Sequence, residues 1–169
     1  MIGWLRRLML GRDVPAGFTG TLADEENVLA VAGDLVATSL GLWLPADDGP
    51  RRIGWHLISK AAWGGGVLSV IEAAESDTAG GAVLLAELPE RRFVLEEPGM
   101  LPRVVHARVT GSIRSRHHQD LPGGGAWFVQ RKVPGVDGIV LQVRPDPGTD
   151  PPQALAFAVE VAGRIRGVR

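Results

Sequence analysis

The chain has 169 residues, of which 45% are hydrophobic and 22% charged, a balance typical of a globular protein and one that excludes a disordered chain. It contains no cysteine, so disulfides, thiolate nucleophiles and cysteine-ligated metal sites are excluded, and a reducing cytoplasm is the expected location. The formal net charge of -1 and the sparse aromatic residues do not favour nucleic-acid binding.

Residues 1–17 are expected to form a short N-terminal helix or arm. They lack the apolar run and small-residue cleavage site of a signal peptide, and no stretch of the chain approaches the roughly 18 apolar residues that span a bilayer. The alternative is an amphipathic segment that holds the protein at a membrane surface. The residues expected to contact the membrane are Trp4, Leu5, Leu8, Arg6 and Arg7.

Short apolar segments separated by glycine and proline predict a mainly β domain, because 23 glycines and 12 prolines interrupt runs rich in Val, Ile, Leu and Trp. Gly33-Asp34 predicts a two-residue type II′ hairpin, since glycine accepts the positive φ of the first turn position. Gly64–Gly66 predicts another turn. The expected strands are 27–32, 35–44, 51–63, 67–73, 82–88, 91–96, 111–119, 126–133 and 138–144.

Residues 101–119 have an ambiguous pattern. Leu101, Val105 and Val109 stand four apart as in a helix, but alternate residues of the same segment would also share one face of a strand, so periodicity alone leaves both structures open. We favour a short helix to about Thr110 and then a strand, because the following Gly111 and Ser112 are poor helix formers.

Residues 151–167 are predicted to form a C-terminal amphipathic helix. Asp150 is placed as its N-cap and Pro151 at its first position. Its apolar residues recur at three- and four-residue steps, which gives the helix one side that can pack on a sheet.

The order of these elements resembles the pleckstrin-homology (PH) superfold, with a meander of about four strands, a second group of strands and a C-terminal helix. The run Ala37-Thr38-Ser39-Leu40-Gly41-Leu42-Trp43, followed by Arg52-Ile53-Gly54-Trp55-His56-Leu57-Ile58, is similar to the paired core strands of bacterial PH-like and GRAM-like domains. The resemblance implies that residues 18–169 form a single antiparallel PH-like split barrel of about seven or more strands, capped by the helix 151–167.

Two features depart from the family pattern. Family members that bind phosphoinositides hold the headgroup with Lys and Arg beside the first hairpin loop, whereas this loop is Gly33-Asp34 and has no neighbouring base. Recognition of inositides by that route is therefore not expected. The second departure is the strand count, since eight or nine segments are expected here where the family implies seven.

Two tryptophans near turns and several basic side chains are the candidates for binding. Trp63 precedes the Gly64–Gly66 turn and Trp127 follows Gly125, so either could be an exposed anchor for a peptide or a flat ligand. The candidate binding residues are Trp63, Trp127, Arg114, Arg116, Arg131 and Lys132.

The polar cluster His117, His118 and Asp120 offers ligands for a divalent metal and supports the alternative of a metal-assisted hydrolase. Adjacent histidines on a strand point to opposite faces, however, so both could not share one ion without a bulge. Neither glycine triplet, Gly64–Gly66 or Gly123–Gly125, has the ending of a phosphate-binding loop, and no Gly-x-Ser-x-Gly motif is present. We therefore expect no catalytic residues, no metal and no cofactor.

The sequence thus predicts a non-enzymatic binding or scaffold domain that recognises a protein or peptide through an edge strand or the groove beside the C-terminal helix. The first alternative is peripheral membrane association through the N-terminal segment, and the second is the metal-assisted hydrolase. An unpaired edge strand would also allow a homodimer.

Overall fold

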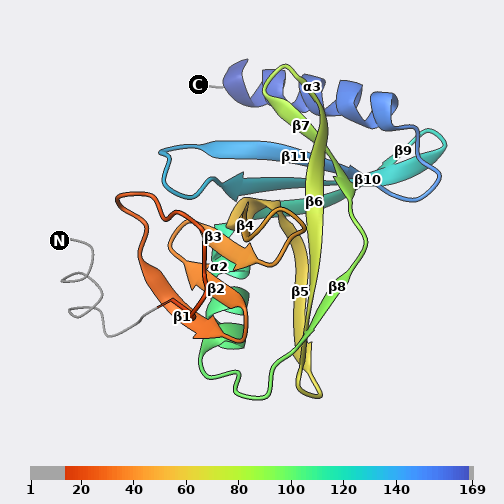
Figure 1. Ribbon diagram of the computed structural model, residues 1–169. Helices are drawn as coiled ribbons and strands as arrows, with labels where there is room; N and C mark the ends of the chain where they lie inside the picture. The colour runs from red at the N-terminus through yellow and green to blue at the C-terminus, as the bar shows by residue number, and fades with distance from the viewer. Residues whose placement is uncertain (1–13, 168–169) are drawn as a thin grey trace.

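The computed structural model of the protein describes residues 14–167 (Figure 1). The predicted N-terminal helix and its membrane-contacting residues lie almost entirely outside this part of the chain. The described chain is mainly β, as predicted, and none of its helices is long and apolar enough to cross a membrane. Its strands are β1 (Val28–Ala32), β2 (Leu35–Thr38), β3 (Gly41–Leu44), β4 (Arg51–Gly54), β5 (Ile58–Gly64), β6 (Val67–Ala79), β7 (Ala82–Glu87), β8 (Arg91–Val94), β9 (Ile113–Leu121), β10 (Gly124–Lys132) and β11 (Ile139–Pro145). Its helices are η1 (Trp55–Leu57), α2 (Leu101–Ser112) and α3 (Pro151–Gly167).

The first sheet is an antiparallel meander in the order β1-β2-β3-β4. Gly33 has a φ of +53° in the β1–β2 turn, as the predicted hairpin requires. The single strand expected over residues 35–44 is wrong, because the chain folds back between β2 and β3. Thr38 causes this turn, since its hydroxyl oxygen accepts the N–H groups of Leu40 and Gly41 at 3.1 and 3.2 Å.

A buried carboxylate organises the edge of the first sheet. Glu26 accepts hydrogen bonds from the Thr38 hydroxyl at 2.5 Å and the Trp43 indole N–H at 2.9 Å, and it pairs with Arg52 at 2.6 Å. Burial alone would raise its pKa, but these donors and the Ala23 N–H more than offset burial, so the pKa of Glu26 lies below its ordinary value. The carboxylate is therefore held in its charged form.

The strand predicted over residues 51–63 is divided at η1. The Trp55 side chain is fully buried, and its indole N–H donates to the Thr38 carbonyl oxygen at 2.9 Å. This buried, hydrogen-bonded side chain lies where the chain passes from the first sheet to the second, so β4 and β5 belong to different sheets.

The second sheet has the order β5-β6-β7-β11-β10-β9, and β8 pairs with β6 along the edge opposite β5. It curls into a half barrel, in which β5 and β6 run crosswise to β9, β10 and β11 (Figure 1). The expectation of purely antiparallel pairing is wrong at one place, because β7 and β11 are parallel, with Ala82 opposite Leu141. The chain between these two strands passes through β8, α2, β9 and β10, and such a long crossover allows β11 to enter in the same direction as β7.

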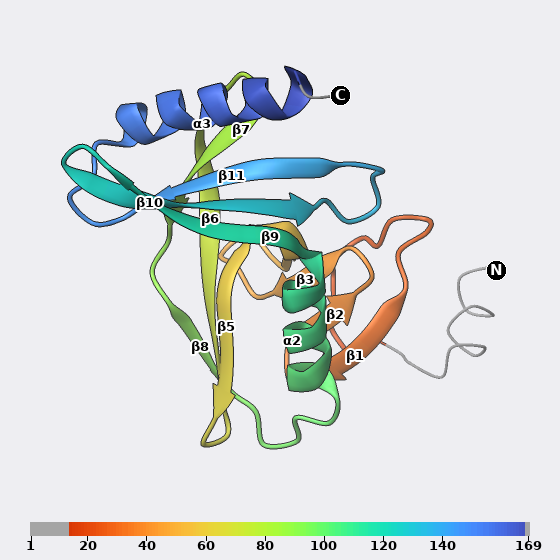
Figure 2. The same ribbon diagram turned by 180° about the vertical axis from the view of Figure 1, so that it is seen from behind.

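The helix favoured at residue 101 is confirmed, and the strand β9 follows it directly. Leu101, Val105 and Val109, at four-residue spacing, turn one side of α2 into a core shared with the first sheet, η1, β5 and β6. Figure 2 shows α2 standing between the meander and the half barrel.

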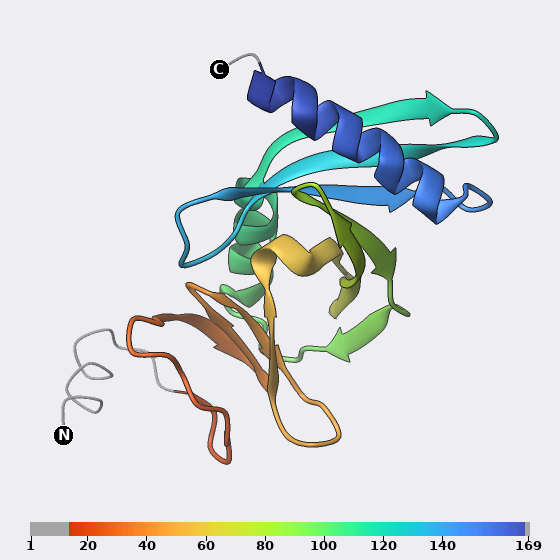
Figure 3. The ribbon, with the colours of Figure 1, turned by 90° about the horizontal axis from the view of Figure 1, so that it is seen from above.

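The C-terminal helix is also confirmed, together with its N-cap, because the Asp150 carboxylate accepts the Gln153 N–H at 3.3 Å. Ala154, Leu155 and Ala158 are buried in a second core with side chains of β7, β10 and β11. Figure 3 shows α3 lying across these strands, so their other face is left for η1 and β5.

Candidate functional site

The side chain of Arg131 lies at the centre of the molecule, although its neighbour Lys132 is exposed. It is only 4% exposed on β10, and its guanidinium donates to the carbonyl oxygens of Trp55 at 2.8 Å, Ile58 at 2.7 Å and Val109 at 3.2 Å. It also donates to the Ser112 hydroxyl at 2.8 Å. This predicted binding residue therefore connects η1, β5, α2 and β10.

No carboxylate pairs with Arg131 among residues 14–167. Burial, and then the positive charge of Arg144, lower the pKa of Arg131 to about 10. The group still carries its charge at neutral pH, so the interior contains a positive charge that is solvated only by neutral oxygen atoms.

A cavity of about 470 Å³ opens beside Arg131 on the sheet face that α3 does not cover. Strand alternation explains its polar lining: Leu141 and Val143 of β11 point toward α3, whereas Gln142 and Arg144 point into the cavity. We call it the basic cleft, after the charged residues that line it. They are Lys60, Glu87, Arg116, Arg131 and Arg144.

Hydrogen bonds link three strands across the basic cleft. Nη1 of Arg144 donates to the Ser59 hydroxyl at 2.5 Å and to Oε1 of Glu87 at 3.1 Å, and Ser59 donates to the same carboxylate oxygen at 2.5 Å. Neither partner of Ser59 is the imidazole base that activates a serine nucleophile. In this cluster the Glu87 carboxylate accepts the hydrogen bond of the Ser59 hydroxyl and also partly neutralises the charge of Arg144.

A second cavity, of about 520 Å³, joins the basic cleft and shares Glu87, Arg116 and Arg144 with it. Its other walls include Trp127, and we call it the proline-lined groove because Pro145, Pro147 and Pro151 border it next to the start of α3. The Arg116 guanidinium lies 4.4 Å from the centre of the Trp127 ring, a cation–π contact. Of the predicted binding residues, Arg116 and Trp127 are therefore brought together.

His118 also contacts Trp127. Its ring meets the indole edge-on at 5.0 Å between centroids, and its Nε2 lies 2.6 Å from Oδ2 of Asp146. His117 lies opposite Phe128, on the α3 side of the sheet, so the two histidines point to opposite faces as the strand pattern predicts. In residues 14–167 no three His, Asp, Glu or Cys side chains are gathered as metal ligands, and Asp120 reaches His118 only at 3.9 Å.

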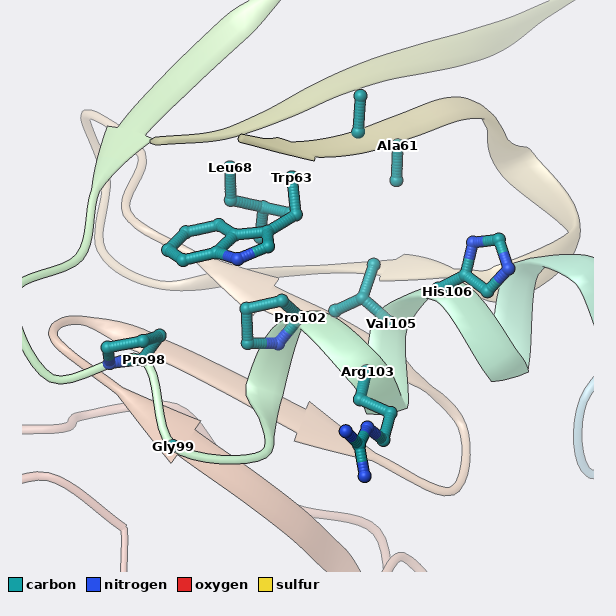
Figure 4. A pocket seen from close by; sticks show the side chains of 10 residues that line it. Ala61, Trp63, Leu68, Pro98, Gly99, Pro102, Arg103, Val105 and His106 are labelled. Carbon is teal, nitrogen blue, oxygen red and sulfur yellow. The ribbon is translucent and has the colours of Figure 1, made fainter. Parts of the chain in front are cut away.

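Trp63 occupies a different site, a cavity of about 430 Å³ between the β5–β6 hairpin and α2. Figure 4 shows its ring beside Leu68 and over Pro102, with Val105 and His106 further along the helix. Trp63 is 42% exposed, and its role as an anchor for a partner stays a prediction. Comparisons with protein-family models, curated proteins and solved structures found no match to this chain.

The remaining predicted residues, Arg114 and Lys132, line a fourth cavity of about 390 Å³ beside the end of α2, together with Arg108. The six candidates are thus distributed over several surfaces and do not form one face. Sequence reasoning missed Lys60 and Glu87, and it considered Arg144 only as part of a basic face with the other arginines. A usable signal was present at Arg144, because it occupies every-second-residue spacing with Gln142 in an otherwise apolar strand.

Proposed function

We propose that this chain is a non-enzymatic binding module that recognises an extended segment of a protein or peptide partner. The observation that carries the proposal is the half-exposed Trp63 in its preformed cavity. Tryptophan is the side chain most enriched at binding hot spots, and a volume of about 430 Å³ is sufficient for one or two partner side chains.

The lining of this cavity defines the chemistry of the partner. Ala61, Leu68, Pro102 and Val105 provide apolar walls beside the indole. Arg103 and His106 also line the cavity, whereas no aspartate or glutamate is among its described lining residues. The segment that fits best carries an apolar side chain for the Trp63 wall and an acidic side chain next to it for Arg103.

Selection from a displayed library of random peptides tests the proposal. Peptides that combine an apolar and an acidic residue should be enriched, and their affinity should fall by about tenfold or more on Trp63→Ala, the loss typical of a hot-spot aromatic. Leu88→Ala is the matched control, because Leu88 is 40% exposed and lies outside the cavity. Failure to select any peptide whose binding depends on Trp63 would contradict the proposal.

We also propose that the fold is an elaborated PH-like barrel. Support comes from the meander of β1 to β4, which is followed by a curled sheet and a helix that packs on it. The parallel β7–β11 pair and the helix α2, which is buried on one side, would then be additions to the family pattern.

A further inference from the structure

We infer that the basic cleft and the proline-lined groove together bind an organic phosphate, with the phosphate group in the cleft and an apolar body in the groove. This site is separate from the Trp63 cavity, so the inference does not depend on the proposed peptide recognition.

The first argument is the charge of the basic cleft. Four cationic side chains and one carboxylate line it. Lys60 and Arg116 form no ion pair within the described chain, and the single carboxylate, Glu87, is shared between Arg144 and Ser59. Arg131 adds its charge from below the surface. Burial is the larger cause of its lowered pKa, and repulsion from the charge of Arg144 lowers that pKa further. A bound anion would relieve this repulsion.

The second argument is that side chains of the basic cleft have hydrogen-bond donors left for a ligand. All three nitrogens of Arg131 already bind protein oxygens, so Arg131 contributes mainly charge. Arg144 uses only Nη1, which leaves its Nε and Nη2 without an acceptor among residues 14–167. A guanidinium fork of this kind matches two oxygens of one oxyanion, and the ammonium of Lys60 can bind a third.

The third argument selects phosphate and its substituent. A phosphate monoester carries about 1.5 to 2 negative charges and three acceptor oxygens, which suits a cleft with several surplus cations better than a carboxylate does. The cleft also adjoins the proline-lined groove, with which it shares the lining residues Glu87, Arg116 and Arg144. A substituent on the phosphate would therefore extend over Trp127.

Isothermal titration calorimetry with phenyl phosphate and with inorganic phosphate, at fixed ionic strength in chloride, tests the inference. Both should bind, and phenyl phosphate should bind more tightly. Lys60→Gln and Arg144→Gln should each weaken both ligands by about tenfold, the value of one charge-assisted hydrogen bond. Trp127→Ala should remove only the advantage of phenyl phosphate.

Two control variants make the result specific. Arg114→Gln removes an exposed arginine of β9 that lines a different cavity, and it should leave phosphate binding unchanged. Trp63→Ala should also leave it unchanged, so loss of peptide binding alone would affect only the proposed function. The inference is overturned if chloride competes as well as phosphate, if Arg114→Gln weakens binding as much as Arg144→Gln does, or if phenyl phosphate binds no more tightly than inorganic phosphate.

Discussion

Replacing Arg131 with methionine should destabilise the protein strongly, because one side chain holds four elements together. Methionine has a similar length but donates no hydrogen bonds. Three backbone carbonyl groups, those of Trp55, Ile58 and Val109, would lose a charged donor. Each such bond contributes about 1.5 to 3 kcal/mol, so the gross loss is at least about 4 kcal/mol.

Part of that loss is offset because the variant no longer buries an unpaired charge. We expect a net decrease of about 2 to 4 kcal/mol in the free energy of unfolding, which lowers Tm by roughly 4 to 16 °C for a chain of this size. Arg131→Lys keeps the charge but loses the planar fork, so its stability should lie between those of the wild type and Arg131→Met.

Urea unfolding followed by circular dichroism measures both variants, and an unchanged m-value would show that the same structure unfolds. The control is Arg114→Met, an exposed arginine on the neighbouring strand, which should change stability by no more than about 0.5 kcal/mol. If Arg131→Met proved as stable as the wild type, the four-element connection described above would have no energetic importance.

Three further predictions concern stability. The folded pKa of Glu26 lies below its ordinary value of 4.5, so its contribution to the free energy of unfolding is complete above that value and is lost as the pH falls through the folded pKa. Glu26→Gln should therefore be less stable than the wild type at pH 7. In urea titrations between pH 7 and 3, its free energy of unfolding should also fall less steeply with acid. Burial and the charge of Arg131, opposed by Glu75, lower the pKa of His56 from 6.5. The free energy of unfolding should therefore fall as the pH drops below 6.5. A His56→Gln variant with the same pH dependence would contradict the assignment of this effect to His56. Gly41→Ala would place a methyl group against the Ile53 carbonyl oxygen, so thermal unfolding should show a loss of about 1 to 3 kcal/mol in the free energy of unfolding. The control is Gly64→Ala, whose added methyl group meets no atom and which should be nearly neutral.

The elements that the sequence predicted correctly depend on local signals. The N-cap Asp150 with Pro151, the four-residue spacing of Leu101 and Val105, and the hairpin glycine Gly33 each act within a few residues of their own position. The turn at Thr38 was missed because a side chain replaces a strand hydrogen bond there, and threonine is otherwise typical of strands.

The candidate site was harder to predict because its residues come from distant strands. Trp63 could be identified from the glycines that follow it. The basic cleft could not, since Lys60, Glu87 and Arg144 meet only through the curl of the second sheet and the β7–β11 pairing. The burial of Arg131 next to the exposed Lys132 likewise follows from the packing of η1 and α2 over one face of β10.

The parallel pairing of β7 with β11 also determines the order in which the protein can fold during synthesis. The meander of β1 to β4 consists of neighbouring hairpins and can close while the ribosome is still adding residues. β7, in contrast, must keep one side of its backbone unpaired until β11 has emerged, and its apolar face is covered only when α3 follows. Until β11 emerges, the nascent chain therefore exposes an unpaired strand edge that can pair with other chains. A chaperone would protect the chain most during this interval.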